Sequence, residues 1–282
     1  MRLPGSRGRQ RKTACGPHDS VTQKGLSEYL RKMTLFLAGV LLSCGGETGS
    51  QVGNPVHVAA ASSLQFVLPE VGTHYQLATG NKVTFSFAAS GSISRQISRG
   101  APIDLFCSAD SRFVRELEAK GAIYPESAAT FAFGRLVLAV NSGAGPGNLE
   151  ELTSAAYPDI GMANPDLAPY GRAAKEALLA TGIWESVAEK VVYGENVAQV
   201  LAYLSRGNIS CAFLPHHLAR WEELGYTEVD PNLYDPIEHL LVIPVSAGNS
   251  SGGRSFAAFV LSLKGRGILQ NHGLRLPDVG ER

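Results

Sequence analysis

Apolar residues along the chain fall into two alternating patterns. Short runs rich in β-branched and aromatic residues are typical of buried strands, and they alternate with stretches where apolar residues recur every three or four positions, as on a helix face. Strands are predicted at Val56–Ala61, Lys82–Phe87, Ile103–Cys107, Arg135–Val140, Asp159–Ala163, Lys190–Tyr193, Ile209–Leu214 and Leu240–Val245. Helices are predicted at Leu64–Ala78, Ser92–Ser98, Ser111–Lys120, Arg172–Ala180, Ile183–Glu189, Val197–Ser205 and Arg254–Leu263. The alternation predicts an α/β fold with largely parallel sheets.

One long apolar run indicates that the chain passes between two lobes. Phe131–Val140 is followed by 141–147, which is rich in Gly and has the composition of a flexible connection. A return passage is expected near Leu240–Val245. These passages predict lobe one at 54–134 plus 246–282 and lobe two at 135–245. Within the first predicted helix, Pro69 is expected to cause a kink, because an interior proline removes a backbone hydrogen bond.

The first 44 residues have the pattern of an export signal, and 45–53 are expected to be a flexible linker. A basic stretch ends at Arg31-Lys32, and the apolar run 33–42 that follows is too short to cross a bilayer as a helix. The sequence Leu41-Leu42-Ser43-Cys44 resembles a bacterial lipoprotein cleavage box, with Cys44 as the acylated residue. An ordinary cleaved signal is the alternative. Either signal predicts a protein of the periplasm or the outer face of the cell envelope.

Charge is distributed unevenly along the chain. The formal net charge is zero, but the first 44 residues carry eight Lys or Arg and two Asp or Glu, which leaves 17 basic and 23 acidic residues beyond them. A net-acidic surface argues against nucleic acid as a partner, because phosphate backbones are bound by clustered Lys and Arg. It does not argue against a small anion that is bound by local dipoles.

Cys107 and Cys211 lie in predicted strands of different lobes, where we expect small buried thiols, with a disulfide as the less favoured alternative.

Four separated segments end an apolar stretch with neutral hydrogen-bond donors just where a helix is expected to begin. They are 58–63, 85–92, 164–171 and 192–197. The first turn of a helix offers unpaired N–H groups and a positive dipole end, so several such turns can bind an anion without Lys or Arg. Each segment alone is better explained as a helix cap or a turn. Their joint occurrence favours a shared site beyond the carboxyl ends of the strands.

In this order and at these separations, and with the linking stretch 99–110 (RGAPIDLFCSAD), the segments resemble the periplasmic molybdate-binding proteins of bacterial ABC importers. The resemblance runs from about Pro55 to Gly273. It implies a two-lobed type II periplasmic-binding-protein fold, each lobe a mostly parallel sheet flanked by helices, with the ligand in the inter-lobe cleft. It also implies capture of molybdate and tungstate for an ABC permease with its ATPase, by a monomer that has no cofactor and performs no catalysis.

Carried over by position, the resemblance also implies which residues bind the oxyanion. These are Ser62, Ser63, Ser90, Tyr170 and Val197. Molybdenum would be held only as the oxyanion, through Ser63, Ser90, Tyr170 and the backbone of Val197. Some relatives have a tyrosine ligand after the late strand, where this chain has Leu214, so no fifth contact is expected there.

Three other functions are compatible with parts of the sequence. Sulfate is also a tetrahedral dianion, and donors alone do not distinguish it from molybdate. A metal-ion receptor would use His216 and His217, although a solvated loop is the simpler explanation of that pair. A serine hydrolase would pair Ser62, Ser63 or Ser90 with one of these histidines, but the chain lacks the Gly-x-Ser-x-Gly elbow.

Overall fold

The computed structural model describes residues 54–278. The predicted leader 1–44 with Cys44, and the predicted linker 45–53, lie outside the described residues. Within 54–278, no helix is both long and apolar enough to cross a membrane.

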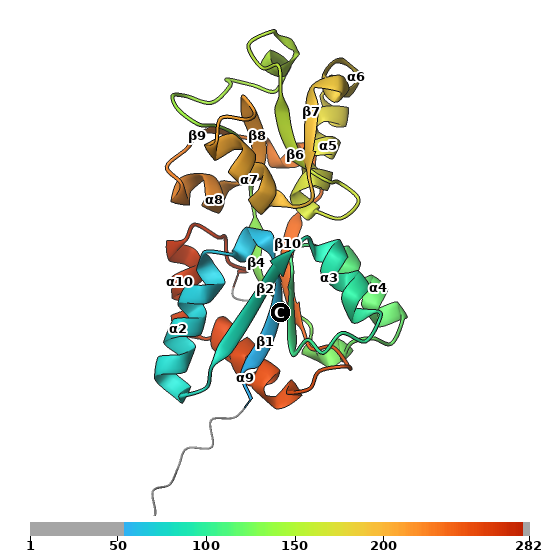
Figure 1. The fold of residues 1–282 in the computed structure, drawn as a ribbon, viewed down its shortest axis with the longest axis vertical. Coiled ribbons are helices and arrows are strands. Elements are labelled where there is room, and N and C mark those ends of the chain that lie inside the picture. Colours follow the sequence, from blue (N-terminus) through green and yellow to red (C-terminus); the bar gives the residue numbers. More distant parts are fainter. Residues whose placement is uncertain (1–53, 279–282) are drawn as a thin grey trace, which may run out of the picture. The chain divides into compact units, whose positions relative to one another are not determined.

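The described residues form two sheets with helices packed around them (Figure 1). The strands are β1 (Val56–Ala61), β2 (Val83–Ala88), β3 (Leu105–Ser108), β4 (Ala129–Gly134), β5 (Leu136–Val140), β6 (Ile160–Ala163), β7 (Val191–Gly194), β8 (Cys211–Pro215), β9 (Gly225–Glu228) and β10 (Ile237–Val242). The α-helices are α2 (Val67–Thr79), α3 (Ser90–Ile97), α4 (Ser111–Ala119), α5 (Pro169–Ala180), α6 (Trp184–Val187), α7 (Val197–Ser205), α8 (His216–Trp221), α9 (Ser250–Leu261) and α10 (Leu263–Asn271). Short 3-10 turns are η1 (Ser62–Leu64), η2 (Pro125–Ser127), η3 (Glu150–Thr153), η4 (Ala188–Lys190) and η5 (Pro231–Leu233).

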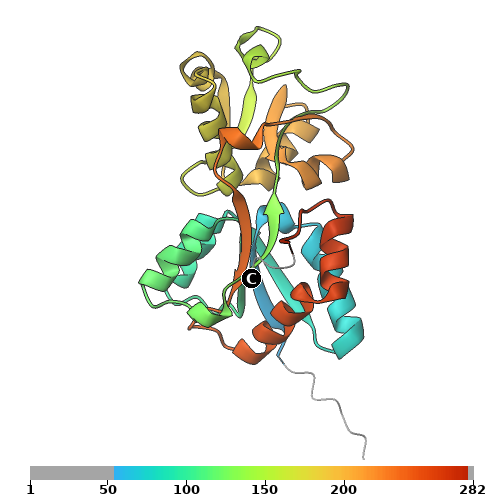
Figure 2. The ribbon, with the colours of Figure 1, turned by 180° about the vertical axis from the view of Figure 1, so that it is seen from behind.

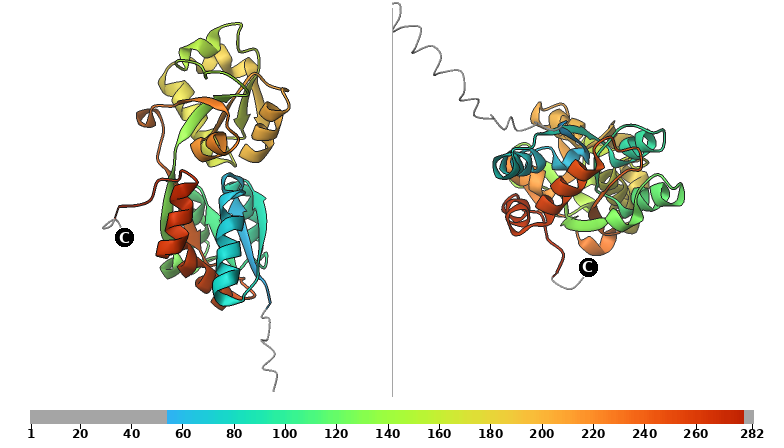
Figure 3. Two further views of the ribbon diagram at one scale, coloured as in Figure 1. Left: turned by 90° about the vertical axis from the view of Figure 1, so that its left-hand side faces the viewer. Right: turned by 90° about the horizontal axis from the view of Figure 1, so that it is seen from below.

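The first sheet has the strand order β2-β1-β3-β10-β4 and forms the core of lobe one. Side chains alternate between its two faces, as strand geometry requires. Ala59 and Phe106 pack with the apolar residues of α3 and α4 on one face. Val58 and Leu105 pack on the other face with residues of α2 and α9. Figure 3 shows α2 and α10 running along the same side of this lobe.

The second sheet has the order β7-β6-β8-β5-β9 and forms lobe two. In each sheet three neighbouring strands run parallel, and the remaining two pairings are antiparallel. The sheets are therefore mixed. In each sheet four of the five strands run in one direction, and β10 or β5 runs against them, so the prediction of mostly parallel strands is confirmed. The antiparallel pairings arise where the chain passes between lobes, because the passing strands return in the opposite direction.

Two chain passages connect the sheets (Figure 2). The first lies at Arg135, between β4 and β5, as the apolar run predicts. The second precedes β10, which pairs with β3 and β4 in the first sheet. The predicted return near Leu240–Val245 is therefore too late, and residues from Ile237 onward belong to lobe one rather than to the predicted lobe two of 135–245.

Other elements differ from prediction near their ends. Pro69 is the third residue of α2, where backbone N–H groups have no helical acceptor in any case, so the expected interior kink does not arise. Sequence periodicity did not predict β4, β9, α8 or α10 as separate elements. Each is short or adjoins another apolar element, which obscures its own period.

The two cysteines within the described residues are buried free thiols, Cys107 in β3 and Cys211 in β8. Burial raises the pKa of each to about 12, so neither is a reactive thiolate at neutral pH. Their positions in different sheets agree with the prediction of small buried residues.

Candidate functional site

A small cavity lies where the parallel strands of both sheets end. Its volume is about 10 Å³, far below the roughly 300–1,000 Å³ typical of sites for drug-sized ligands. The residues lining it are Ala61, Ser62, Ser63, Ala88, Ala89, Ser90, Ala109, Ala168, Pro169, Tyr170 and Val197. The set includes all five residues that the sequence predicts as oxyanion ligands. Segments far apart in the chain are thus brought to one point.

Helix starts supply the donors of this cavity. Within residues 54–278, no side chain caps the first turn of α3 or of α5. At α7, the Asn196 side chain accepts hydrogen bonds from the backbones of Ala198 and Gln199, at 3.0 and 3.1 Å. That cap leaves the first N–H group of the helix, on Val197, free for a ligand. These turns therefore direct unpaired N–H groups and helix dipoles into the cavity.

The serine hydroxyls add donors in a buried, uncharged setting. Ser63 is 1% exposed and Ser90 is fully buried. The Ser90 Oγ accepts a hydrogen bond from the Ala109 N–H at 3.1 Å, so its own proton remains available to a ligand. Among the described residues that line the cavity, none is charged. The arrangement suits an anion with no proton of its own, because it offers donors and no carboxylate acceptor.

Two buried histidines contact Ser63. His217 of α8 places Nε2 2.7 Å from the Ser63 carbonyl oxygen, and His239 of β10 places Nε2 3.5 Å from the Ser63 Oγ. Burial lowers the pKa of His217 to about 4 and that of His239 to about 3, so both rings are neutral at pH 7. The expectation of a solvated loop at His216 and His217 is wrong, because these residues start α8 and are buried.

The ring of Tyr170 lies beside both buried histidines, and its hydroxyl lies close to β4. A Cβ atom placed on Gly134 would come 2.1 Å from the Tyr170 hydroxyl oxygen. Among the described residues, that oxygen has no hydrogen-bond partner. The backbone N–H of Tyr170, in the first turn of α5, is therefore the donor that we expect to face the cavity.

Direct contacts join the two lobes at the cavity. The Gly91 N–H of α3 donates to the Leu167 carbonyl at 2.9 Å, and His217 of lobe two meets Ser63 of lobe one. Also from α8, the Trp221 ring stacks on Phe66 at 5.7 Å and on His272 at 4.6 Å, measured between centroids. Lobe two thus contacts lobe one through α8 and through Leu167.

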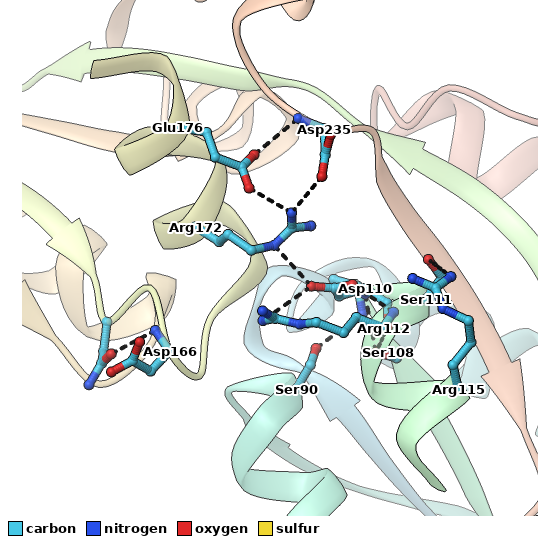
Figure 4. Close-up of polar contacts among 12 residues, drawn as sticks. Ser90, Ser108, Asp110, Ser111, Arg112, Arg115, Asp166, Arg172, Glu176 and Asp235 are labelled. Carbon is cyan, nitrogen blue, oxygen red and sulfur yellow. Dashed lines mark hydrogen bonds and ion pairs between the residues drawn. The ribbon is translucent and has the colours of Figure 1, made fainter. Parts of the chain in front are cut away.

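An ion-pair network that no local pattern of the sequence predicts also spans the lobes. Arg172 of α5 reaches from lobe two to the Asp110 carboxylate in front of α4, with 3.3 Å between Nε and Oδ2 (Figure 4). Arg172 also pairs with Glu176 at 2.7 Å and with Asp235 at 3.2 Å. Burial alone would lower the pKa of Arg172, but these three carboxylates outweigh burial and raise it. Asp110 is in the stretch that carries the resemblance, but its partner comes from a distant helix.

The His216 side chain contacts Arg135 and Tyr226 rather than the cavity. Its Nδ1 lies 2.9 Å from the Arg135 guanidinium, and its Nε2 lies 3.1 Å from the Tyr226 hydroxyl. Within residues 54–278, no group of three or more His, Cys, Asp or Glu side chains could hold a metal ion. A guanidinium beside His216 further argues against a cation receptor built on the His216-His217 pair.

The fold defines the class of this protein: a two-lobed solute-binding protein, with a small cavity between its lobes. The chain belongs to the family of bacterial extracellular solute-binding proteins, whose model matches residues 56–275. It is 28% identical to the molybdate-binding protein ModA of Azotobacter vinelandii over 261 residues, 89% of this chain and all of that protein. It is 26% identical to the putative ABC transporter substrate-binding lipoprotein YvgL of Bacillus subtilis, over 89% of this chain and 98% of that protein.

A solved structure extends the comparison. The fold is similar to that of the periplasmic molybdate-binding protein of Azotobacter vinelandii, with a TM-score of 0.73 and 26% identity. The match covers 79% of this chain and 99% of that structure. The predicted two-lobed periplasmic-binding-protein fold is confirmed.

Proposed function

We propose that this protein captures molybdate, and tungstate as a close chemical analogue, and delivers it to an ABC importer. The observation that carries the proposal is the buried, uncharged cavity into which Ser63, Ser90 and several helix starts direct donors. Relatives named as molybdate-binding proteins support the choice of ligand. Sulfate is the alternative ligand of the same class.

The donor set favours a fully ionised tetrahedral dianion. Ser62, Ser63 and Ser90 would donate from hydroxyl or backbone groups, while Tyr170 and Val197 would donate from backbone N–H groups. Phosphate is partly protonated at neutral pH and would need an acceptor for its proton, which a cavity of alanines and serines offers poorly. Molybdenum would therefore be bound only through its oxygens, without a protein–metal bond.

Ligand capture would favour the closed arrangement of the lobes. Ser63 and Ser90 belong to lobe one, whereas Tyr170 and Val197 belong to lobe two. An anion that contacts both lobes binds the closed form more tightly than the open form. It stabilises the closed form by the difference between these two binding free energies. A permease and its ATPase could then distinguish loaded from empty protein by the distance between the lobes.

The remaining features of the proposal concern the cell envelope. We infer export and anchoring through a lipid on Cys44, a site outside the described residues, as a monomer that needs no cofactor and catalyses no reaction. The substrate-binding lipoprotein among the relatives supports the anchor. Radiolabelled palmitate incorporation that disappears in Cys44→Ala would support acylation, whereas unchanged labelling would contradict it.

Isothermal titration with molybdate, tungstate, sulfate and phosphate in parallel tests the ligand. We expect tight one-to-one binding of molybdate and tungstate and much weaker binding of the other two. Binding of sulfate alone would reassign the ligand within the same architecture. Binding of none of the four would contradict an oxyanion receptor.

Ser63→Ala and Ser90→Ala should each weaken molybdate binding by about 1–3 kcal/mol, because each leaves a buried charged oxygen without a donor. Titration calorimetry measures the loss, and thermal unfolding checks that the fold is intact. Ser186→Ala is the matched control, since Ser186 is exposed on α6 and far from the cavity lining. Unchanged affinity in both cavity variants would refute these ligand assignments.

A further inference from the structure

The candidate ligand Ser63 is contacted by two imidazoles from different parts of the fold. His239, on β10 of lobe one, faces its hydroxyl at 3.5 Å. His217, on α8 of lobe two, faces its carbonyl oxygen at 2.7 Å. Both histidines are buried, His239 completely so. Such placement suggests a role for the rings in orienting Ser63.

The surroundings of His239 determine which of its nitrogens carries the proton. Its ring packs against Phe131, Tyr170 and His217, with centroids 5.9–6.3 Å away. None of these neighbours is a carboxylate, and a buried ring among them stays neutral with a single N–H. Among the described residues, Nδ1 has no hydrogen-bond partner. A proton on Nδ1 would therefore be a buried donor without an acceptor, whereas a proton on Nε2 points to the Ser63 Oγ.

That tautomer controls the function of the serine. A hydroxyl has one proton to donate and two lone pairs that accept. If His239 donates from Nε2, the Ser63 Oγ accepts from it and can donate its own proton to an anion. If Nε2 were unprotonated, Ser63 would donate to His239 and turn lone pairs toward the anion, which would repel it.

We propose that His239 is a positioning residue that donates from Nε2 to Ser63 and thereby directs the Ser63 proton toward the bound oxyanion. This inference rests on the proposed function of the cavity. His217 supports the same arrangement from lobe two: because a carbonyl only accepts, its Nε2 must carry the proton. The Ser63 peptide is thus held by lobe two only when the lobes are in contact.

The direct test is the tautomer itself, observed by long-range ¹H–¹⁵N NMR of the ¹⁵N-histidine-labelled full chain. His239→Gln identifies the resonance by its disappearance. We expect the Nε2–H tautomer in the ligand-free protein. A protonated Nδ1 with a bare Nε2 would overturn the proposal, and this result is readable whether or not any oxyanion binds.

Affinity for molybdate provides the functional test. His239→Gln retains a donor near the Nε2 position and should keep affinity within about threefold, whereas His239→Met, of similar length without a donor, should lose about tenfold or more. In a Ser63→Ala background, His239→Met should cause little further loss, because its effect acts through Ser63. Equal losses for Gln and Met, or full additivity with Ser63→Ala, would overturn the proposal. If wild-type protein bound no oxyanion, the proposed function would fail, and the NMR result would still decide the tautomer.

Discussion

Replacing Arg172 with Met will weaken oxyanion binding by at least about tenfold, although Arg172 lies outside the cavity lining. Asp110 is 3% exposed and Arg172 is 17% exposed where they meet across the lobes. Truncating one partner of a buried charge pair typically costs about 2–5 kcal/mol, because the other charge is left desolvated. Asp110 immediately follows Ala109 of the cavity lining. Without Arg172 its carboxylate would still pair with Arg112 at 3.7 Å, but its charge would be less compensated and would also repel the anion.

A double-mutant cycle with Asp110→Asn isolates the contribution of the pair. We expect Asp110→Asn to restore part of the affinity lost in Arg172→Met, because it removes a carboxylate that only Arg112, among the described residues, would still compensate. Asp235→Asn is the matched control: this carboxylate also pairs with Arg172 but is 78% exposed, so its loss should matter little. Calorimetry gives the affinities. If Arg172→Met and Asp235→Asn bound molybdate equally well, the pair would have no role in closure.

Gly134→Ala should destabilise the protein by about 3 kcal/mol, which is the upper end of the usual cost of overpacking. Its new Cβ would overlap the hydroxyl of the buried Tyr170 and would come 3.0 Å from the Ile237 side chain of β10. The strain falls next to the passage between lobes, so molybdate affinity should fall together with the melting temperature. Thermal unfolding and calorimetry measure the two effects.

Tyr170→Phe supplies the suppressor for this clash. Removing the hydroxyl from the Gly134→Ala protein should recover part of its stability, although the Tyr170 ring carbon at 2.9 Å would still be crowded. Tyr170→Phe alone should leave affinity nearly unchanged if the backbone N–H is the ligand donor. Gly267→Ala is the control glycine change, since nothing lies within 4 Å of its added Cβ. A Gly134→Ala protein as stable as wild type would contradict this packing.

The sequence predicted the elements of the fold well where periodicity was strong and local. Strand β1 and helix α7 match their predicted bounds, while β10 begins three residues before its predicted start at Leu240. Periodicity within a segment carries no information on strand pairing. The mixed sheets and the return passage before Ile237 therefore could not be read from it.

In the candidate site, too, features set by neighbouring residues were predictable from the sequence, whereas contacts between residues far apart in the chain were not. The segments that hold Ser62, Ser63, Ser90 and Val197 were predictable because each stands at a strand end or a helix start, which is a local feature of the sequence, and the family resemblance implied the individual residues. His239 is 176 positions from Ser63, and Arg172 is far from Asp110 in the chain. Only the folded chain shows these partners, because apolar neighbours and isolated charges give no signal of pairing on their own.

The walls of the cavity have a consequence for selectivity. Alanine side chains, which have no rotamers to lose, alternate there with short serines and backbone N–H groups. A site built from Lys or Arg would lose about 1.5–2 kcal/mol of side-chain entropy for each residue that becomes ordered. Donors fixed by the fold avoid most of that loss, but they also cannot move to follow a smaller ligand. Rigidity of this kind would let the protein discriminate between dianions of equal charge by the lengths of their metal–oxygen or sulfur–oxygen bonds alone.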